Sequence, residues 1–419
     1  MKILFVNTND KYGGAAIAAY RLLKGMQENG VSAKMLVQSK ESDDYNVMEP
    51  QKKRQKIFSK IRPILDSIPV RFYKQRKKII FSPAVLPDNV YKRIHEINPD
   101  IIHLHWVASG FIKIETLVKL KKPIVWTLHD MWAFTGGCHY DENCGKYFKN
   151  CGDCPILNSN KKNDLSYRIW KRKEKSWKNL DLTIVTPSSW LGECARKSSL
   201  FSKTRIEVIP NGIDLNRFKP IDKKIARDIL HLPKDKKHIL FGAISALSDK
   251  RKGFLLLKEA LKKYSSKENK DIELIIFGSS KPREEEKLGF RTHYLGQLND
   301  EISLELVYSA ADVMIVPSIQ DNLPNTVMES LACGTPVVAF NIGGIPDMIE
   351  HQENGYLVKS FDTGDLAYGI NWILENKMRW KKLSVNARKK VEKEFDINKI
   401  AKRYTDLYKD ILKKNTNSK

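Results

Sequence analysis

The feature that most constrains the fold of this chain is its alternation of short apolar, β-branched runs with segments of helical length. This pattern is typical of parallel sheets, whose strands are buried on both faces and joined by crossover helices. In the first half we expect strands at Lys2–Val6, Lys34–Val37, Ile101–His105, Ile124–Leu128 and Leu182–Thr186. In the second half we expect them at His238–Gly242, Ile272–Gly278, Val313–Val316 and Pro336–Phe340. The pattern predicts two doubly wound, Rossmann-like α/β domains.

The length of 419 residues and the hydrophobic content of 42% are enough for two buried cores. The turn Ile209-Pro210-Asn211-Gly212 separates the two series of strands. We therefore predict a first domain over residues 1–207 and a second over 208–376. Apolar residues at helical spacing continue to the end of the chain, and we expect helices over 377–419 that return to the first domain.

We expect no export signal, because the first apolar run turns polar after Val6. No run approaches the 18 apolar residues of a membrane span. Seventy-three Lys and Arg against 49 Asp and Glu give a formal net charge of +24. Such a field attracts nucleic acid, anionic lipid or phosphorylated substrates. We expect a cytoplasmic protein.

A basic segment spans residues 51–81 and holds eleven Lys or Arg against one acid, Asp66. Apolar residues such as Ile57, Phe58, Ile61 and Ile64 are interleaved with the charges. The pattern fits a solvated helix with an ordinary apolar face, a surface for anionic lipid, or a nucleic-acid site. Pro63 and Pro69 are expected to break it into short pieces.

The most informative stretch runs from Pro317 to Ala339 and is expected to form a strand, loop, helix, turn and strand. Pro324 suits a helix start, so backbone amides around Asn325 and Thr326 would hold an anion such as a diphosphate. Asp321 in the loop and Glu329 in the helix could accept hydrogen bonds from sugar hydroxyls. The alternative is a capping Asp and a solvated Glu.

This stretch resembles the signature of the retaining glycosyltransferase family four, which places seven residues between an acidic residue and a Glu. The resemblance implies the GT-B fold, with two Rossmann-like domains facing a central cleft. It assigns Asp321 to the donor sugar and Glu329 to the nucleotide ribose. The family's first acid is usually Glu, and Asn322-Leu323-Pro324-Asn325 replaces its Gly-Phe-Gly type of loop.

Two glycine turns of the second domain resemble the same family. They are Ile209-Pro210-Asn211-Gly212-Ile213-Asp214 and Asn341-Ile342-Gly343-Gly344-Ile345-Pro346-Asp347, in which Gly344 would approach the donor. The segment Ser248-Asp249-Lys250-Arg251-Lys252-Gly253 offers cations for the diphosphate. The family usually has an Arg near the position of Ala246, and we propose that Arg251 replaces it beside Lys252.

The first domain carries two further candidates at the ends of expected strands. Gly13 and Gly14 resemble the family's first-loop glycines, which approach the donor phosphate, although a tight turn would also explain them. His129, in Thr127-Leu128-His129-Asp130, resembles the family's His-Asp pair beside the donor sugar. A structural role is the alternative for this histidine. His103 and His105 are weaker candidates.

Four cysteines, Cys138, Cys144, Cys151 and Cys154, fall in a short insertion over residues 136–155. Four thiols could close around a tetrahedral structural zinc. Buried reduced thiols and disulfides are the alternatives, and disulfides are disfavoured in a reducing cytosol. A subset of family-four transferases resembles this Gly-Gly-Cys-His insertion, which implies that it braces the acceptor loop.

The resemblance spans the chain from the first loop to Gly355. It implies a retaining, metal-independent transfer from a UDP- or GDP-sugar, in which His129, Asp321, Arg251 and Lys252 act on the sugar and the diphosphate. The basic segment favours a lipid-linked or glycan acceptor in surface polysaccharide synthesis, at the inner face of the membrane. The rivals are a nucleotide-sugar epimerase and a nucleic-acid-binding protein, the latter without a recognised module. A nicotinamide oxidoreductase would need Gly-x-Gly-x-x-Gly, which the first loop lacks.

Overall fold

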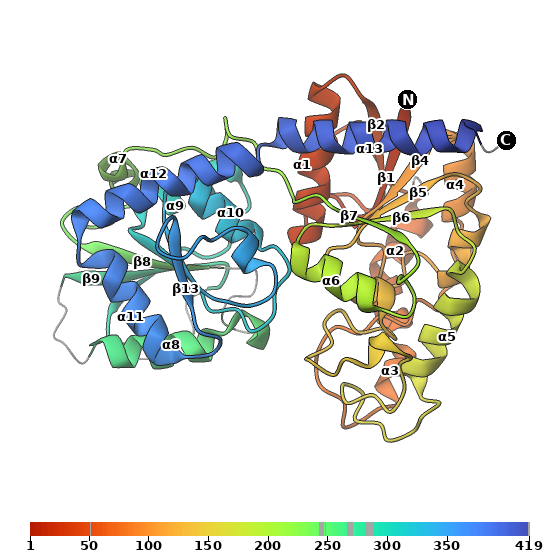
Figure 1. Cartoon of the computed structure of the whole chain (residues 1–419), viewed down its shortest axis with the longest axis horizontal. Coiled ribbons are helices and arrows are strands. Elements are labelled where there is room, and N and C mark those ends of the chain that lie inside the picture. Colours follow the sequence, from red (N-terminus) through yellow and green to blue (C-terminus); the bar gives the residue numbers. More distant parts are fainter. Residues whose placement is uncertain (51, 243–246, 248, 266–270, 281–287, 418–419) are drawn as a thin grey trace. The chain divides into compact units, whose positions relative to one another are not determined.

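The structure, a computed structural model, describes residues 1–50, 52–242, 247, 249–265, 271–280 and 288–417. The chain divides into two compact units. Met1–Pro210 and Ile400–Lys419 form the first, and Asn211–Lys399 forms the second. Figure 1 labels the helices and strands of both units.

The first unit is built on a seven-stranded sheet with the order β3-β2-β1-β4-β5-β6-β7. Every neighbouring pair of strands is parallel. The strands are β1 (Lys2–Asn9), β2 (Ser32–Ser39), β3 (Val47–Met48), β4 (Ile101–Leu104), β5 (Ile124–Thr127), β6 (Leu182–Thr186) and β7 (Arg205–Val208). All residues of β4 and β5 are buried, as expected for central strands that are covered on both faces.

The helices of the first unit connect these strands and cover the sheet. They are α1 (Gly14–Glu28), α2 (Lys53–Asp66), α3 (Ile68–Arg71), α4 (Val90–Ile97), α5 (Leu165–Trp177) and α6 (Ser189–Lys197), with short 3-10 turns η1 (Ile114–Lys119), η2 (Trp132–Phe134) and η3 (Lys146–Phe148). The last helix, α13 (Ile397–Asn417), joins this unit from Ile400 onward. Its Tyr404 and Tyr408 are buried and bond to Thr127 and His103 of the sheet at 2.9 and 2.7 Å.

The second unit has a six-stranded parallel sheet with the order β10-β9-β8-β11-β12-β13. Its strands are β8 (Lys237–Gly242), β9 (Ile272–Phe277), β10 (Arg291–Tyr294), β11 (Val313–Val316), β12 (Val337–Phe340) and β13 (Gly355–Val358). The helices are α7 (Lys223–Ile229), α8 (Phe254–Ser265), α9 (Glu301–Ala310), α10 (Asn325–Ala332), α11 (Thr363–Leu374) and α12 (Lys377–Glu394), with 3-10 turns η4 (Lys250–Lys252) and η5 (Ile345–Asp347).

Two apolar cores fill the second unit, one on each face of its sheet. Leu240 and Ile275 pack with α9 and α10 on one face, and Ile239 and Leu274 pack with α8 and α11 on the other. Figure 1 shows α8 and α11 side by side. This alternation along β8 and β9 follows from the two-residue repeat of a strand.

The structure differs from the sequence-based expectations in three places. Strands β3, β7, β10 and β13 were not predicted, and all four are edge strands. Pro63 lies inside α2 rather than breaking it. Within 377–419, α12 belongs to the second unit and only residues from Ile400 cluster with the first. Within the described ranges, no helix combines the length and apolar character needed to cross a bilayer.

Candidate functional site

An ion cluster forms at the loop after β11 in the second unit. The Asp321 carboxylate accepts a bond from Lys252 Nζ at 2.7 Å and lies 3.3 Å from the Arg251 guanidinium. Arg251 also donates to the carbonyl of Gln320 at 3.1 Å and pairs with Asp249 at 3.2 Å. The predicted catalytic residues of this unit are therefore in contact with one another.

The Asp321 side chain is buried, and the neighbouring cations Lys252 and Arg251 keep its carboxylate ionised. Burial alone would raise its pKa, but Lys252 and Arg251 hold the pKa below its ordinary value, so the carboxylate stays ionised at neutral pH. The cluster thus presents two cations that are fixed by one buried anion. Such a pair is suited to bind a diphosphate and to stabilise negative charge that develops on a leaving group.

Helix α10 begins beside this loop without a side-chain cap. Its N-cap is Pro324, and its first residues are Asn325 and Thr326. In contrast, α9, α11 and α12 each begin at an Asp or Asn whose side chain accepts bonds from the first turn. A helix start that its N-cap side chain does not cap, together with the positive end of the helix dipole, favours an anion such as a phosphate.

Glu329 lies further along α10 and is buried. The hydroxyl of Tyr308, on α9, donates to Glu329 Oε2 at 2.8 Å. This bond holds one carboxylate oxygen, and a carboxylate has lone pairs to accept further hydrogen bonds. Tyr308 was not among the predicted site residues, because twenty-one residues separate it from Glu329 and only the packing of α9 on α10 brings them together.

The glycine turn after β12 packs directly on the Asp321 loop. Gly343 has a φ of +54°, and a Cβ at this position would lie 1.9 Å from the backbone oxygen of Asp321. The next amide, of Gly344, donates to the same oxygen at 3.3 Å. The sequence predicts Gly344 as the residue of close approach, but Gly343 is the position whose backbone requires glycine.

We expect Gly343→Ala to lower the free energy of unfolding by about 2–4 kcal/mol, because the added methyl group strains the backbone and displaces the Asp321 loop. Gly296→Ala is the matched control, since Gly296 has a φ of +68° with nothing within 4 Å of its Cβ position. The control should cost about 1 kcal/mol. Urea unfolding of both variants measures the difference, and equal losses would contradict this account of Gly343.

In the first unit, the loop after β1 leads into an uncapped helix. Gly13 is the N-cap of α1, with a φ of +94°, and apart from its chain neighbours no described residue places an atom within 4 Å of its Cβ position. Gly14 is the exposed first residue of the helix. The open space before the helix start suits an anionic ligand. The loop is anchored by the buried Asp10, which accepts bonds from the amides of Glu41 and Ser42 at 2.8 and 2.9 Å.

His129 follows β5 and lies beside His105, which follows β4. His129 Nε2 and His105 Nδ1 are 3.0 Å apart, and the rings stack at 5.3 Å. Burial lowers the pKa of His129 to about 4, and neighbouring Asp130 only partly opposes this effect. His129 is therefore neutral at physiological pH, and its ring can donate or accept a hydrogen bond to a sugar hydroxyl without carrying charge. His103 instead bonds Thr127 and Tyr408 and is wholly buried, which gives it a structural role.

Asp130 anchors the insertion that follows β5. Its carboxylate accepts bonds from Trp106 Nε1 at 2.7 Å and His139 Nδ1 at 2.6 Å. His139 Nε2 in turn lies 2.9 Å from Ser82 Oγ. The two residues of the His129-Asp130 pair therefore have different contacts. His129 packs on His105, whereas Asp130 holds the cysteine-rich insertion.

The four cysteines of the insertion do not assemble the predicted zinc ligand set. Among the described residues, only His238, Glu273 and His293 bring three such ligand atoms within 4.8 Å of one another. All four thiols are free, and burial raises the pKa of each. The amide of Gly136 donates to Cys151 Sγ at 3.1 Å. The structural zinc at these four cysteines therefore stays a prediction.

The structure thus joins Arg251, Lys252 and Asp321 in the second unit and places His129 in the first. Two positions that entered the sequence argument, Ala246 and Ser248, lie outside the described residues, as does Gln51 of the basic segment. The Arg251 side chain contacts Asp249, Gln320 and Asp321, which all belong to the second unit.

Two family models match the chain in succession. The model described as glycosyltransferase family 4 matches residues 12–217. The model described as glycosyl transferases group 1 matches residues 222–390. The first covers most of the unit with Gly13 and His129, and the second covers Arg251, Lys252, Asp321 and Glu329.

Curated relatives and solved structures agree with these matches. A D-inositol 3-phosphate glycosyltransferase 2 of Catenulispora acidiphila is 29% identical over 44% of this chain and 45% of its own length. The putative colanic acid biosynthesis glycosyl transferase WcaC of Escherichia coli is 26% identical over 60% of this chain and 62% of its own. The matches therefore span about half to two thirds of these relatives.

The solved structure of Anabaena HepE in complex with UDP-glucose has a TM-score of 0.64 and 18% identity, over 98% of this chain and all of that one. At 18% identity, this structural similarity shows the fold alone. With the two successive family matches, it shows that this chain belongs to the family 4 glycosyltransferases and has the GT-B fold.

Proposed function

We propose that this protein is a retaining glycosyltransferase that moves a sugar from a UDP- or GDP-sugar to a lipid-linked or glycan acceptor in the synthesis of a cell-surface polysaccharide. The observation that carries the proposal is the cluster of Asp321, Lys252 and Arg251 beside the uncapped start of α10. Two cations and a helix N-terminus form a site for a diphosphate. The family's chemistry supplies the reaction.

In the proposed reaction, the bond between the anomeric carbon and the diphosphate oxygen breaks while the acceptor hydroxyl attacks the same face. Arg251, Lys252 and the first amides of α10 stabilise the negative charge on the departing diphosphate. The leaving phosphate oxygen takes the acceptor proton. Asp321 positions both cations, and His129 orients the sugar as a neutral hydrogen-bonding partner. Catalysis through these groups requires no divalent metal.

The donor assignment rests on Glu329 and its support by Tyr308. We propose that the carboxylate of Glu329 accepts hydrogen bonds from the ribose hydroxyls, as the family resemblance implies. A related fold has been solved with UDP-glucose, which supports a nucleoside diphosphate sugar as the donor class.

We expect Glu329→Ala to weaken donor affinity by about 10- to 100-fold, since a hydrogen bond to a charged acceptor contributes about 1.5–3 kcal/mol. Tyr308→Phe should have a smaller effect of the same sign, because it removes one bond that helps to orient the carboxylate and leaves the carboxylate itself in place. Ligand-observed NMR with UDP, GDP and their sugar conjugates measures this affinity, with NAD as a negative control. Unchanged binding of the preferred donor by Glu329→Ala would refute the assignment.

A nucleotide-sugar epimerase would use the same donor site without an acceptor. Product analysis separates the two functions, because an epimerase returns a changed nucleotide sugar whereas a transferase releases the nucleoside diphosphate. Release of free diphosphate that depends on added glycan or lipid acceptor supports transfer. Conversion of the donor into an isomer without release would favour the epimerase.

The basic segment over residues 51–81 favours an acceptor that is located at an anionic membrane, or an enzyme that binds to one. In α2 the usual burial pattern is reversed, because the buried residues are Ser59, Arg62 and Asp66. Arg62 donates to the carbonyls of Gly110 and Pro87, and Asp66 accepts bonds from the amides of Ala84 and Val85. The polar face is thus held against the protein by hydrogen bonds.

The outward face of α2 is apolar and surrounded by positive charge. Ile57, Phe58, Ile61 and Ile64 are between 41% and 55% exposed. Exposed basic residues adjoin them, including Lys53, Arg54, Lys56 and Lys60. An apolar face with flanking Lys and Arg suits an interfacial helix on anionic lipid. We therefore propose a peripheral position at the inner face of the cell membrane, with α2 as the anchor.

A further inference from the structure

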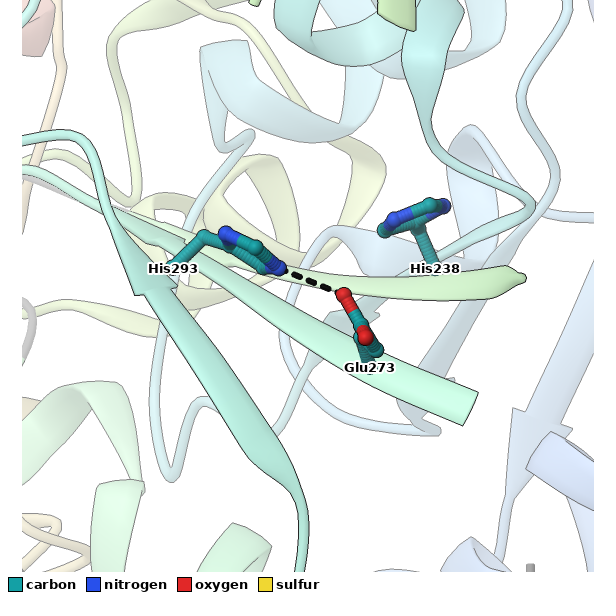
Figure 2. A group of neighbouring side chains, drawn as sticks. All are labelled: His238, Glu273 and His293. Atoms are coloured by element: carbon teal, nitrogen blue, oxygen red, sulfur yellow. Dashed lines mark hydrogen bonds and ion pairs between the residues drawn. The ribbon is translucent and has the colours of Figure 1, made fainter. Parts of the chain in front are cut away.

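Three metal-ligating side chains meet in the second unit at a place that the proposed transfer does not use. They are His238 on β8, Glu273 on β9 and His293 on β10, and their ligand atoms all lie within 4.8 Å of one another. Figure 2 shows the three side chains pointing toward one another from these strands. His293 Nε2 and Glu273 Oε2 already lie 2.6 Å apart.

The strand register explains why the three side chains share one face of the sheet. His238 is paired with Glu273 across β8 and β9, and Glu273 is paired with Arg291 across β9 and β10. His293 lies two residues beyond Arg291, so it points to the same face. His238 and Glu273 are each the second residue of their strand, whereas Asp321 follows the carboxyl end of β11. The group therefore lies near the opposite end of the sheet from the proposed donor site.

His238 is the unusual member of the group. It is fully buried, and neither of its ring nitrogens has a hydrogen-bond partner in the described part of the chain. Buried polar groups are nearly always paired, because an unpaired one loses its hydration without compensation. Its backbone amide donates to Asp312 Oδ2 at 2.7 Å, and its backbone carbonyl accepts from the Asp312 amide at 2.9 Å, but neither bond involves the ring. A ligand that accepts an imidazole lone pair would give a ring nitrogen of His238 the partner that it lacks.

We propose that His238, Glu273 and His293 bind a divalent transition-metal ion of the Zn²⁺ class. Two imidazole nitrogens and one carboxylate oxygen form a ligand set that such ions prefer, with a fourth position for water. Tetrahedral ligands at the usual Zn–N and Zn–O distances are about 3.4 Å apart. The three ligand atoms lie within 4.8 Å of one another, so side-chain rotations that move each atom by roughly 1 Å would bring them to that spacing.

The charges around the group are compatible with a cation. Arg227 interacts electrostatically with His238, but its guanidinium pairs with Asp312 at 2.7 Å. Lys223 pairs with the same carboxylate at 2.6 Å. Arg291 lies 3.7 Å from Glu273 Oε1 and is largely exposed, so it can turn toward solvent when Glu273 binds a metal.

The position of the group indicates what the ion would do. β10 is a four-residue edge strand, and its His293 side chain is 18% exposed, which gives an ion a path from solvent. A metal bound to all three residues would link this edge strand to β9 and β8. The ion would therefore stabilise the second unit without taking part in sugar transfer.

The test uses the untagged full-length protein after dialysis against a chelator, titrated with Zn²⁺ and separately with Co²⁺. We expect one Zn²⁺ per chain to bind saturably at this group, with an affinity that falls more than about 100-fold in His293→Gln and in Glu273→Gln. Zn²⁺ at 100 times its Kd should raise the unfolding temperature of the second unit by roughly 5–10 °C. Glu273→Gln can still accept the bond from His293, so loss of binding is separated from loss of folding.

Two controls distinguish this group from other zinc-binding side chains. His231→Asn changes an exposed histidine of the same unit, at a φ of +54° that Asn tolerates, and should leave binding unchanged. Co²⁺ bound to nitrogen and oxygen shows visible bands without the near-ultraviolet thiolate band that cysteine ligation would add. Absence of saturable binding, binding insensitive to His293→Gln and Glu273→Gln, or a thiolate band alone would each overturn the proposal.

Discussion

Asp321→Asn is expected to reduce the rate of sugar transfer by about 100- to 1,000-fold, the usual effect of losing one electrostatic stabiliser of a transition state. The side chain of Asp321 is nearly the same size as Asn, so the change removes charge rather than volume. Without that charge, Lys252 and Arg251 lose the anion that fixes them at 2.7 and 3.3 Å. The two cations would then repel each other and leave the position in which they meet the diphosphate.

The expected loss lies in the chemical step, so kcat should fall more than the donor affinity. The measurement is diphosphate release with saturating donor and acceptor, accompanied by donor binding and thermal unfolding of the same variant. Asp321→Glu should recover part of the rate, since Glu is the usual residue of the family at this position. Because its pKa is lowered, Asp321 keeps its stabilising charge at and above neutral pH and loses it only as the pH falls below the ordinary Asp range.

Asp271→Asn is the matched control, because Asp271 is an exposed residue of the same unit whose side chain pairs with the exposed end of Lys236 at 3.1 Å. Exposed pairs of this kind contribute little, so the control should transfer sugar at the parent rate. If Asp321→Asn retained more than half of the parent kcat while staying folded, the cluster would not be the catalytic site that we propose.

Replacing Ile57, Ile61 and Ile64 together by Ser is expected to weaken binding to anionic vesicles by roughly 30- to 150-fold. The estimate of about 2–3 kcal/mol assumes that each half-exposed side chain contributes part of the value for full apolar burial. These residues point away from the protein, so the fold should tolerate the change. Sedimentation with phosphatidylglycerol vesicles measures the binding, and neutral phosphatidylcholine vesicles should bind the parent protein weakly.

The matched control replaces Ile225, Ile229 and Leu255 of the second unit by Ser. These side chains are between 55% and 69% exposed, and they lie on α7 and α8 rather than on α2. If this control weakened vesicle binding as much as the change in α2, the effect would come from general surface hydrophobicity. If the parent protein did not sediment with anionic vesicles at low salt, the membrane proposal would fail.

The sequence alone determined the central architecture, because buried strands can be recognised in a sequence as apolar runs. Leu182–Thr186 and Val313–Val316 coincide with the expected strands, and the other predicted strands differ only at their ends. Asp321, Glu329 and the glycine turn after β12 were visible for a related reason, since each lies at a fixed spacing within one strand-loop-helix unit. Local spacing is preserved by folding, so it can be read before the structure is known.

Only the tertiary structure decided features that depend on pairing between distant segments. The edge strands β7 and β10 have half-buried residues with no continuous apolar run, so their sequences resemble loops. The same reason hid the contact of Asp321 with Lys252, sixty-nine residues away, and the meeting of His238 with His293. The reversed burial of α2 also depends on distant segments, because the carbonyls that accept hydrogen bonds from Arg62 come from other parts of the first unit. Which face of an element is buried depends on what packs against it, and that information lies outside the element.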